Sequence, residues 1–167
     1  MDFGVRPRDK TPKSGVAHCK LSPSQESENE QIQNQIMLIC FFDSKGIVHK
    51  EFVPPGQTVN QTFYREVLER LRKSVARVRP GIARTWMLHH DNAPCHTAVS
   101  INEFLIEKCI PVVPQPPYSP DLSPSDLFLF PRLKNHLKGR QFVTLDNVQK
   151  SVTDELKGIP AEAFQHC

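Results

Sequence analysis

Residues 37–53 read MLICFFDSKGIVHKEFV, and this stretch indicates how the fold begins. Residues 37–42 and 47–53 are strand-length runs rich in apolar residues, and residues 43–46 form a short turn that contains glycine. Two such runs joined by a turn of this kind predict a β-hairpin. Pro54-Pro-Gly56 follows and ends the second strand. The ordered domain is therefore expected to start with an antiparallel pair of strands.

An amphipathic helix is expected after the hairpin, with Thr58 or Asn60 as its cap and Pro80 as its stop. Its apolar stripe repeats at spacings of three and four and consists of Phe63, Tyr64, Val67, Leu68, Leu71, Val75 and Val78. Basic residues lie mostly off that stripe, namely Arg65, Arg70, Arg72, Lys73, Arg77 and Arg79. We interpret these cations as the solvated face of the helix.

The rest of the chain alternates between the two kinds of element. The expected order is a strand at 85–90, a helix at 98–108, a short strand at 110–113, a proline-rich loop at 114–124, a helix from 126 to about 137 capped by Ser123 or Ser125, and a weaker helix at 145–156. Helices placed between the later strands predict an α/β layered sheet with flanking helices.

Composition limits the class of protein. Hydrophobic residues make up 38% of the chain and charged residues 23%, which fits one globular domain. Residues 1–36 are polar and predict a disordered arm, which leaves 37–167 as the domain. The five cysteines include no CxxC pair, and no apolar run is long enough to span a bilayer. We therefore expect a cytosolic or nuclear protein that is not secreted, with no membrane partner and no small-molecule substrate.

Two aspartates are candidate ligands for a metal ion. Asp91 follows the predicted strand at 85–90, and Asp126 starts a predicted helix. Carboxylates at strand ends and helix starts suit Mg²⁺ or Mn²⁺, and a pair of such ions drives phosphodiester cleavage when several carboxylates hold it. A turn-forming role for Asp91 and a capping role for Asp126 explain the same positions. His89, His90 and His96 would suit zinc, but no cysteine pair accompanies them.

Two segments carry a resemblance to a known family. Residues 90–96 read HDNAPCH and residues 118–126 read YSPDLSPSD, with 34 residues between Asp91 and Asp126. This combination resembles the mariner branch of the Tc1/mariner transposases, whose second and third catalytic aspartates lie in such segments at this distance. Residues 54–58 (PPGQT) and 137–142 (LKGRQF) look like further segments of the same family.

The resemblance implies an RNase H-like fold that cuts and joins DNA strands with Mg²⁺ or Mn²⁺. It also implies DNA as the partner, a homodimer and a nuclear location. Asp91 and Asp126 would be catalytic metal ligands, and His90, Asn92 and His96 would shape the loop or approach DNA. Four cations would contact phosphates, or else form a solvated face, in a stretch without acids at 127–140; they are Arg132, Lys134, Lys138 and Arg140.

The chain departs from the family at the first catalytic aspartate. The family carries it in a "TGDE"-like strand ahead of the hairpin, and no such segment occurs here. Neither Asp2 nor Asp43 is a convincing replacement. Because that strand is also the middle strand of the family's sheet, we expect an incomplete sheet. Two hypotheses follow: a transposase-derived nucleic-acid-binding protein without strand cleavage, which we favour, or an active Mg²⁺-dependent DNA endonuclease or transposase.

Overall fold

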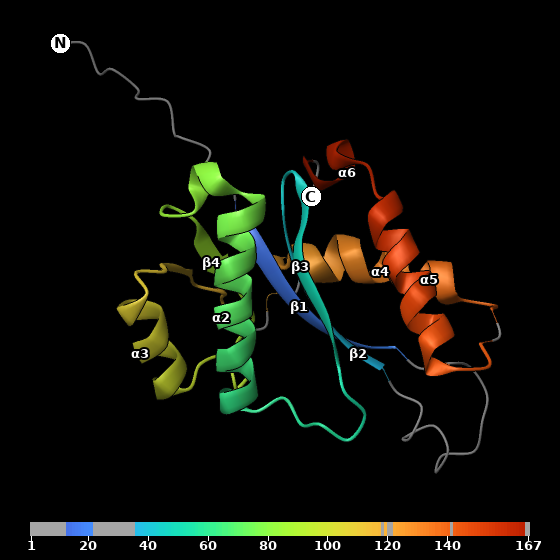
Figure 1. The fold of residues 1–167 in the computed structure, drawn as a ribbon, viewed down its shortest axis with the longest axis horizontal. Helices are drawn as coiled ribbons and strands as arrows, with labels where there is room; N and C mark the ends of the chain where they lie inside the picture. The colour runs from blue at the N-terminus through green and yellow to red at the C-terminus, as the bar shows by residue number, and fades with distance from the viewer. Residues whose placement is uncertain (1–12, 22–35, 118, 120–121, 141, 166–167) are drawn as a thin grey trace.

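The computed structural model describes residues 13–21, 36–117, 119, 122–140 and 142–165 (Figure 1). In chain order the elements are β1 (Lys13–Leu21), β2 (Ile36–Asp43), β3 (Gly46–Val53), α2 (Gln61–Val78), a 3₁₀ turn (Pro80–Ile82), β4 (Met87–His89), α3 (Val99–Glu107), β5 (Val112–Val113), a π-helical turn η3 (Ser125–Leu129), α4 (Phe130–Leu137), α5 (Leu145–Gly158) and α6 (Ala161–Gln165). The predicted α/β class is confirmed.

The sheet has five strands in the order β3-β2-β1-β4-β5. β1 pairs antiparallel with β2 on one side and parallel with β4 on the other. The expectation of a missing middle strand is therefore wrong, and residues 13–21 do not belong to a disordered arm. The remaining residues of that predicted arm, 1–12 and 22–35, lie outside the described residues.

The reason for the missed strand is visible in its sequence, KSGVAHCKL. Small and polar residues interrupt its apolar positions, so no continuous hydrophobic run marks it. Its place in the sheet satisfies backbone N–H and C=O groups that β2 and β4 would otherwise leave unpaired. A strand selected in this way by its neighbours carries only a weak local signal.

The hairpin of β2 and β3 confirms the prediction from residues 37–53, with a tighter turn than expected. Asp43 pairs with Gly46 around only two turn residues, and Gly46 has a φ of 122° that glycine adopts without strain. The register shifts between Phe41, which pairs with His49, and Phe42, which pairs with Ile47. Val48 is therefore the extra residue of a β-bulge, a device that redirects neighbouring side chains.

Helices cover both faces of the sheet (Figure 1). Alternate residues of β2 serve the two layers: Ile39 and Phe41 pack in the core with α2 and α3, whereas Leu38, Cys40 and Phe42 pack in the core with α4 and α5. This alternation explains why β2 is an uninterrupted apolar run. Both of its faces are buried.

The helix ends show one prediction confirmed and one wrong. Asn60 caps α2 by accepting a hydrogen bond from the Phe63 N–H at 2.9 Å. Neither Ser123 nor Ser125 caps the later helix; instead η3 leads directly into α4, with no side-chain cap. Among the described helices, none combines the length and apolar character that crossing a membrane requires.

Candidate functional site

Asp91 lies just beyond the end of β4, in the loop that leads to α3. Its Oδ1 accepts a hydrogen bond from the Ala93 N–H at 3.0 Å and lies 2.5 Å from His96 Nδ1. The side chain is 49% exposed. These contacts hold the carboxylate in an Asx-turn while part of it faces solvent, as a ligand or substrate contact requires.

A cluster of buried aromatic rings, formed by Tyr64, His90 and His96, supports this loop. His96 is fully buried, its ring lies 4.0 Å from Tyr64, and it stacks on His90 at 5.3 Å between ring centres. The Tyr64 hydroxyl lies 3.0 Å from His90 Nδ1. Burial, and then the charge of Asp91, raise the pKa of Tyr64 well above its usual value, so the phenol stays protonated and can donate.

The cluster alters the roles expected of the two histidines. His90 is 7% exposed and His96 is 0% exposed. Direct contact with DNA, one of the two roles expected for them, does not fit these positions. Their placement fits the other role, which is to shape the loop and to orient Asp91. Tyr64 takes part from α2, although its sequence position marks it only as a core residue of the apolar stripe.

Asn92 lies on the exposed side of the same loop. Its Nδ2 donates to the backbone carbonyl of Gln115 at 2.8 Å, and the Gln115 side chain lies 2.6 Å from His89 Nε2. Gln115 belongs to the proline-rich segment that follows β5. Asn92 therefore ties two loops together, a role that its sequence position alone does not reveal.

Asp126 lies in the first turn of η3 and is exposed. η3 contacts β1, the same strand that pairs with β4 ahead of Asp91. Two features set this turn apart. It is π-helical, a geometry that often occurs at functional sites, and the Ser125 hydroxyl is buried with no hydrogen-bond partner among the described residues. Both aspartates thus lie on segments that neighbour the middle strand.

The residues that the structure describes do not fit a complete metal site. Within the described residues, no group of three or more histidine, cysteine, aspartate or glutamate side chains could hold a metal ion. The middle strand β1 contains neither aspartate nor glutamate. Binding two Mg²⁺ or Mn²⁺ ions requires several carboxylates, so Asp91 and Asp126 alone supply too few ligands.

The four predicted phosphate-contacting cations fall into two groups. Arg132 donates to Glu155 of α5 at 2.8 Å, and the same carboxylate lies 3.0 Å from His136. The hydrogen bond from Arg132 is the main reason that the pKa of Glu155 is lowered. This pair therefore contributes stability above the usual pKa of a glutamate and loses it as the pH falls through the lowered value. The other three cations are exposed, namely Lys134, Lys138 and Arg140.

Replacing His96 with alanine is expected to lower the free energy of unfolding by about 2–4 kcal/mol. The substitution removes a fully buried ring and leaves Asp91 without one of its partners. Urea denaturation followed by circular dichroism measures the loss. Asn92→Ala, on the exposed side of the loop, is the control, and equal losses for both variants would contradict the supporting role of His96.

Comparison with known proteins agrees with this geometry. The family model described as "Transposase (partial DDE domain)" matches residues 11–85, a range that includes β1. Mariner Mos1 transposase of Drosophila mauritiana is 34% identical over 117 residues, which cover 68% of this chain and 34% of that protein. Histone-lysine N-methyltransferase SETMAR of Homo sapiens is 31% identical over 110 residues, or 65% of this chain and 16% of that protein.

Solved structures give the same result. The catalytic domain of Mos1 superposes with a TM-score of 0.82 at 27% identity, over 92% of this chain and 74% of that one. A Mos1 paired-end complex with Mn superposes with a TM-score of 0.80 at 26% identity, over 93% and 50% of the two chains. The chain spans about a third of the length of Mos1 transposase. Sequence segments, sheet order and these matches agree that the chain belongs to the mariner-type transposases of the Tc1/mariner superfamily and represents part of their DDE/D nuclease domain.

Proposed function

We propose that this chain is a transposase-derived DNA-binding protein that does not cleave DNA strands. The observation that carries the proposal is that β1 contains no acidic residue. This strand lies in the middle of the sheet, between β2, which leads into the hairpin turn, and β4, which leads to Asp91. Its sequence contains neither aspartate nor glutamate. The fold therefore includes a middle strand, but this strand has no carboxylate that could bind a metal ion.

The absence of an acidic residue in β1 matters because DNA strand cleavage needs carboxylates that bind metal ions. Two metal ions must be held close together, one to activate water and the other to stabilise the leaving oxygen. Asp91 is fixed by its loop, and Asp126 stands exposed at the start of η3. Two carboxylates leave such a pair of ions short of both ligands and negative charge. The proposed loss of cleavage therefore has a local chemical cause.

DNA binding is assigned to the exposed cations of α4 and the segment after it. α4 continues directly from η3, so Lys134 follows Asp126 along one helical run, and Lys138 and Arg140 come just after α4 ends at Leu137. Lys134, Lys138 and Arg140 are exposed, and none of them has an ion pair in the described part of the chain. Cations of this kind bind the phosphate backbone without reading sequence.

The proposal extends to the setting in which the chain works. Mos1 transposase has been solved in a paired-end complex with a left transposon end. We assign the same class of partner, duplex DNA, to this chain, together with pairing of two copies on it. With DNA as its partner, the chain is proposed to act in the nucleus.

Replacing all three exposed cations tests the binding face. Lys134→Gln, Lys138→Gln and Arg140→Gln together are expected to weaken binding to a short duplex by tenfold or more at low salt, on the order of magnitude that lost phosphate contacts produce. The slope of log affinity against log salt should fall by about 2–3. Fluorescence anisotropy over a sodium chloride series measures both quantities.

A matched control separates a binding face from general charge. Lys45→Gln, Arg84→Gln and Lys157→Gln remove the same charge from exposed positions on other segments. This control should keep most of the wild-type affinity. Equal losses for the two triple variants, or no binding by the wild-type chain at low salt, would contradict the assignment to α4.

Strand cleavage is tested on supercoiled plasmid. With Mg²⁺ or Mn²⁺ the purified chain is expected to produce no nicked circles above the background without protein. Nicking that disappears in both Asp91→Asn and Asp126→Asn would overturn the proposal and support the alternative, an active metal-dependent endonuclease or transposase.

A further inference from the structure

The basic face of α2 divides into paired and unpaired cations. Arg72 pairs with Glu69 at 2.7 Å, and Arg79 pairs with Asp43 at 2.7 Å. Lys73 and Arg77 are both exposed, and neither makes a hydrogen bond or ion pair with another described residue. The expectation of a solvated face therefore needs refinement, because Lys73 and Arg77 keep their charge available for an external partner, as does Arg65, which lies over the Phe104 ring.

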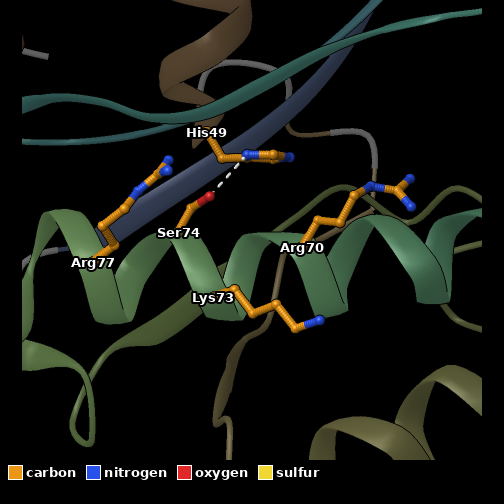
Figure 2. A pocket seen from close by; sticks show the side chains of 5 residues that line it. All are labelled: His49, Arg70, Lys73, Ser74 and Arg77. Carbon is orange, nitrogen blue, oxygen red and sulfur yellow. Dashed lines mark hydrogen bonds between the residues drawn. The ribbon is translucent and has the colours of Figure 1, made fainter.

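These two cations line a pocket between α2 and the edge strand β3. Its volume is 330 Å³, and the residues that line it are His49, Arg70, Lys73, Ser74 and Arg77 (Figure 2). Figure 2 shows that Ser74 points toward His49, with Arg70 and Arg77 on either side of this pair. Every lining side chain can donate a hydrogen bond, and none carries a negative charge.

The β-bulge in β3 explains how His49 reaches this pocket. Val48 packs in the core with α2, and in a regular strand the next side chain would face the opposite layer. Because Val48 is the extra residue of the bulge, His49 also turns toward α2, where its Nδ1 lies 3.1 Å from the Ser74 hydroxyl. The bulge therefore places an imidazole and a hydroxyl together on the pocket floor.

Glu51 contacts two of the lining residues, His49 and Arg70, and holds them in place. Its carboxylate lies 3.0 Å from His49 Nε2 and 3.0 Å from Arg70 Nη2. Burial alone would raise the pKa of Glu51, but the hydrogen bonds from His49 and Arg70 outweigh it and lower the pKa. The charge of Arg70 is thus balanced by Glu51, which leaves Lys73 and Arg77 as the uncompensated charges of the pocket.

Helical spacing gathers the four α2 residues of the pocket. Positions 70, 73, 74 and 77 are related by steps of three and four and therefore lie along one side of the helix. Such an array offers an arginine fork, an ammonium group and a hydroxyl to one anion. Phosphate oxygens accept this set of donors well, because several acceptors share one centre.

We propose that this pocket, defined by His49, Arg70, Lys73, Ser74 and Arg77, binds a backbone phosphate of nucleic acid. The inference goes beyond the proposed function, because it assigns a second contact surface on the other face of the sheet. α2 covers one face and α4 lies against the other (Figure 1). The α2 residues of the pocket lie about 9–20 Å along the helix from Tyr64, which supports the Asp91 loop, and the two sites share no residue, so the pocket is also distinct from the carboxylate site.

The test compares two double variants that change the net charge equally. Lys73→Gln with Arg77→Gln removes the unpaired cations of the pocket, and Lys45→Gln with Lys157→Gln removes two exposed cations that do not line it. Binding of a fluorescent 20-base-pair duplex is measured by anisotropy over a salt series. The pocket variant should bind on the order of tenfold more weakly, and its salt slope should fall by about 1–2, with little change for the control.

Amide shifts in NMR spectra identify the source of the phosphate. Titration with the duplex should shift the amides of residues 73–77 in the wild-type chain and not in the pocket variant. Shifts with inorganic phosphate but none with the duplex would overturn the proposal, since the pocket would then bind a free anion only. Equal affinity losses in the two double variants would also overturn it, because the basic face would then act as general charge.

These outcomes remain separate from those of the proposed function. If the α4 triple variant binds normally and the pocket variant does not, the assignment of DNA binding to α4 is wrong and the pocket stands. If the reverse holds, the pocket is wrong and the α4 face stands. Thermal unfolding of each variant verifies that it is folded, and the exposed positions of Lys73 and Arg77 make a folding defect small.

Discussion

Deletion of residues 1–21 is expected to abolish cooperative folding, whereas deletion of residues 1–12 leaves β1 intact and preserves it. The longer deletion removes the middle strand, which pairs with β2 on one side and β4 on the other. Both neighbours would lose a complete ladder of backbone hydrogen bonds and would become open edges. Such a loss exceeds the roughly 5–15 kcal/mol by which domains of this class are stable.

Two measurements check this prediction. Thermal unfolding followed by circular dichroism should show a single transition for the shorter deletion and none for the longer one. Size-exclusion chromatography should show aggregation of the longer deletion, since exposed strand edges pair with other chains. A longer deletion that unfolds cooperatively near the wild-type temperature would show that β1 is not needed as the middle strand.

Replacing Arg79 with methionine is expected to cost about 3–5 kcal/mol of unfolding free energy. Arg79 donates to both oxygens of Asp43, at 2.7 Å and 3.1 Å, and the Asp43 side chain is only 2% exposed. The variant leaves a buried carboxylate without its counter-charge. This pair joins the end of α2 to the hairpin turn, so the loss affects two elements of the fold together.

An exposed pair on the same helix gives the control. Arg72→Met breaks the ion pair between Arg72 and Glu69, whose side chains are 43% and 33% exposed respectively. Exposed ion pairs contribute only about 0–1 kcal/mol to the free energy of unfolding. Chemical denaturation of both variants measures the contrast. The double variant Asp43→Asn with Arg79→Met should recover part of the loss, because it removes the unpaired charge. Similar losses for Arg72→Met and Arg79→Met would contradict the role of burial.

The presence of β1 leaves the missing carboxylate, and not a missing strand, as the reason to expect no strand cleavage. An incomplete sheet would have made the whole domain doubtful as a folded unit. The structure instead has a middle strand, and the family model also extends across it. What the strand lacks is an acidic residue. The proposed absence of strand cleavage therefore rests on too few ligands for metal ions. The plasmid-nicking assay tests this proposal directly.

Much of the fold could be predicted from local patterns. The hairpin and α2 were predictable because both faces of β2 and one stripe of α2 are buried, and burial imposes a visible periodicity on the sequence. The segments around Asp91 and Asp126 indicated the family because motif residues and their separation are properties of the chain alone. The roles proposed for these two aspartates remain predictions.

Other features depended on partners that lie far away in the sequence. Glu155 neutralises Arg132 from another helix, although no acid occurs at 127–140. His49 enters the α2 pocket because of a bulge, which shifts the alternation of side chains by one residue. His96 is buried against Tyr64 of α2, although its motif suggested an approach to DNA. Long-range packing of this kind leaves no periodic signal.

The sequence by itself determined the family, the α/β class, the hairpin, α2 and the two aspartates, because burial patterns and motif spacing are written along the chain. Only the tertiary structure decided that the sheet has a middle strand and which cations remain unpaired. The physical reason is the same for both. Strand pairing and charge neutralisation depend on backbone and side-chain groups brought together from distant positions, and these partners are defined only once the chain has folded.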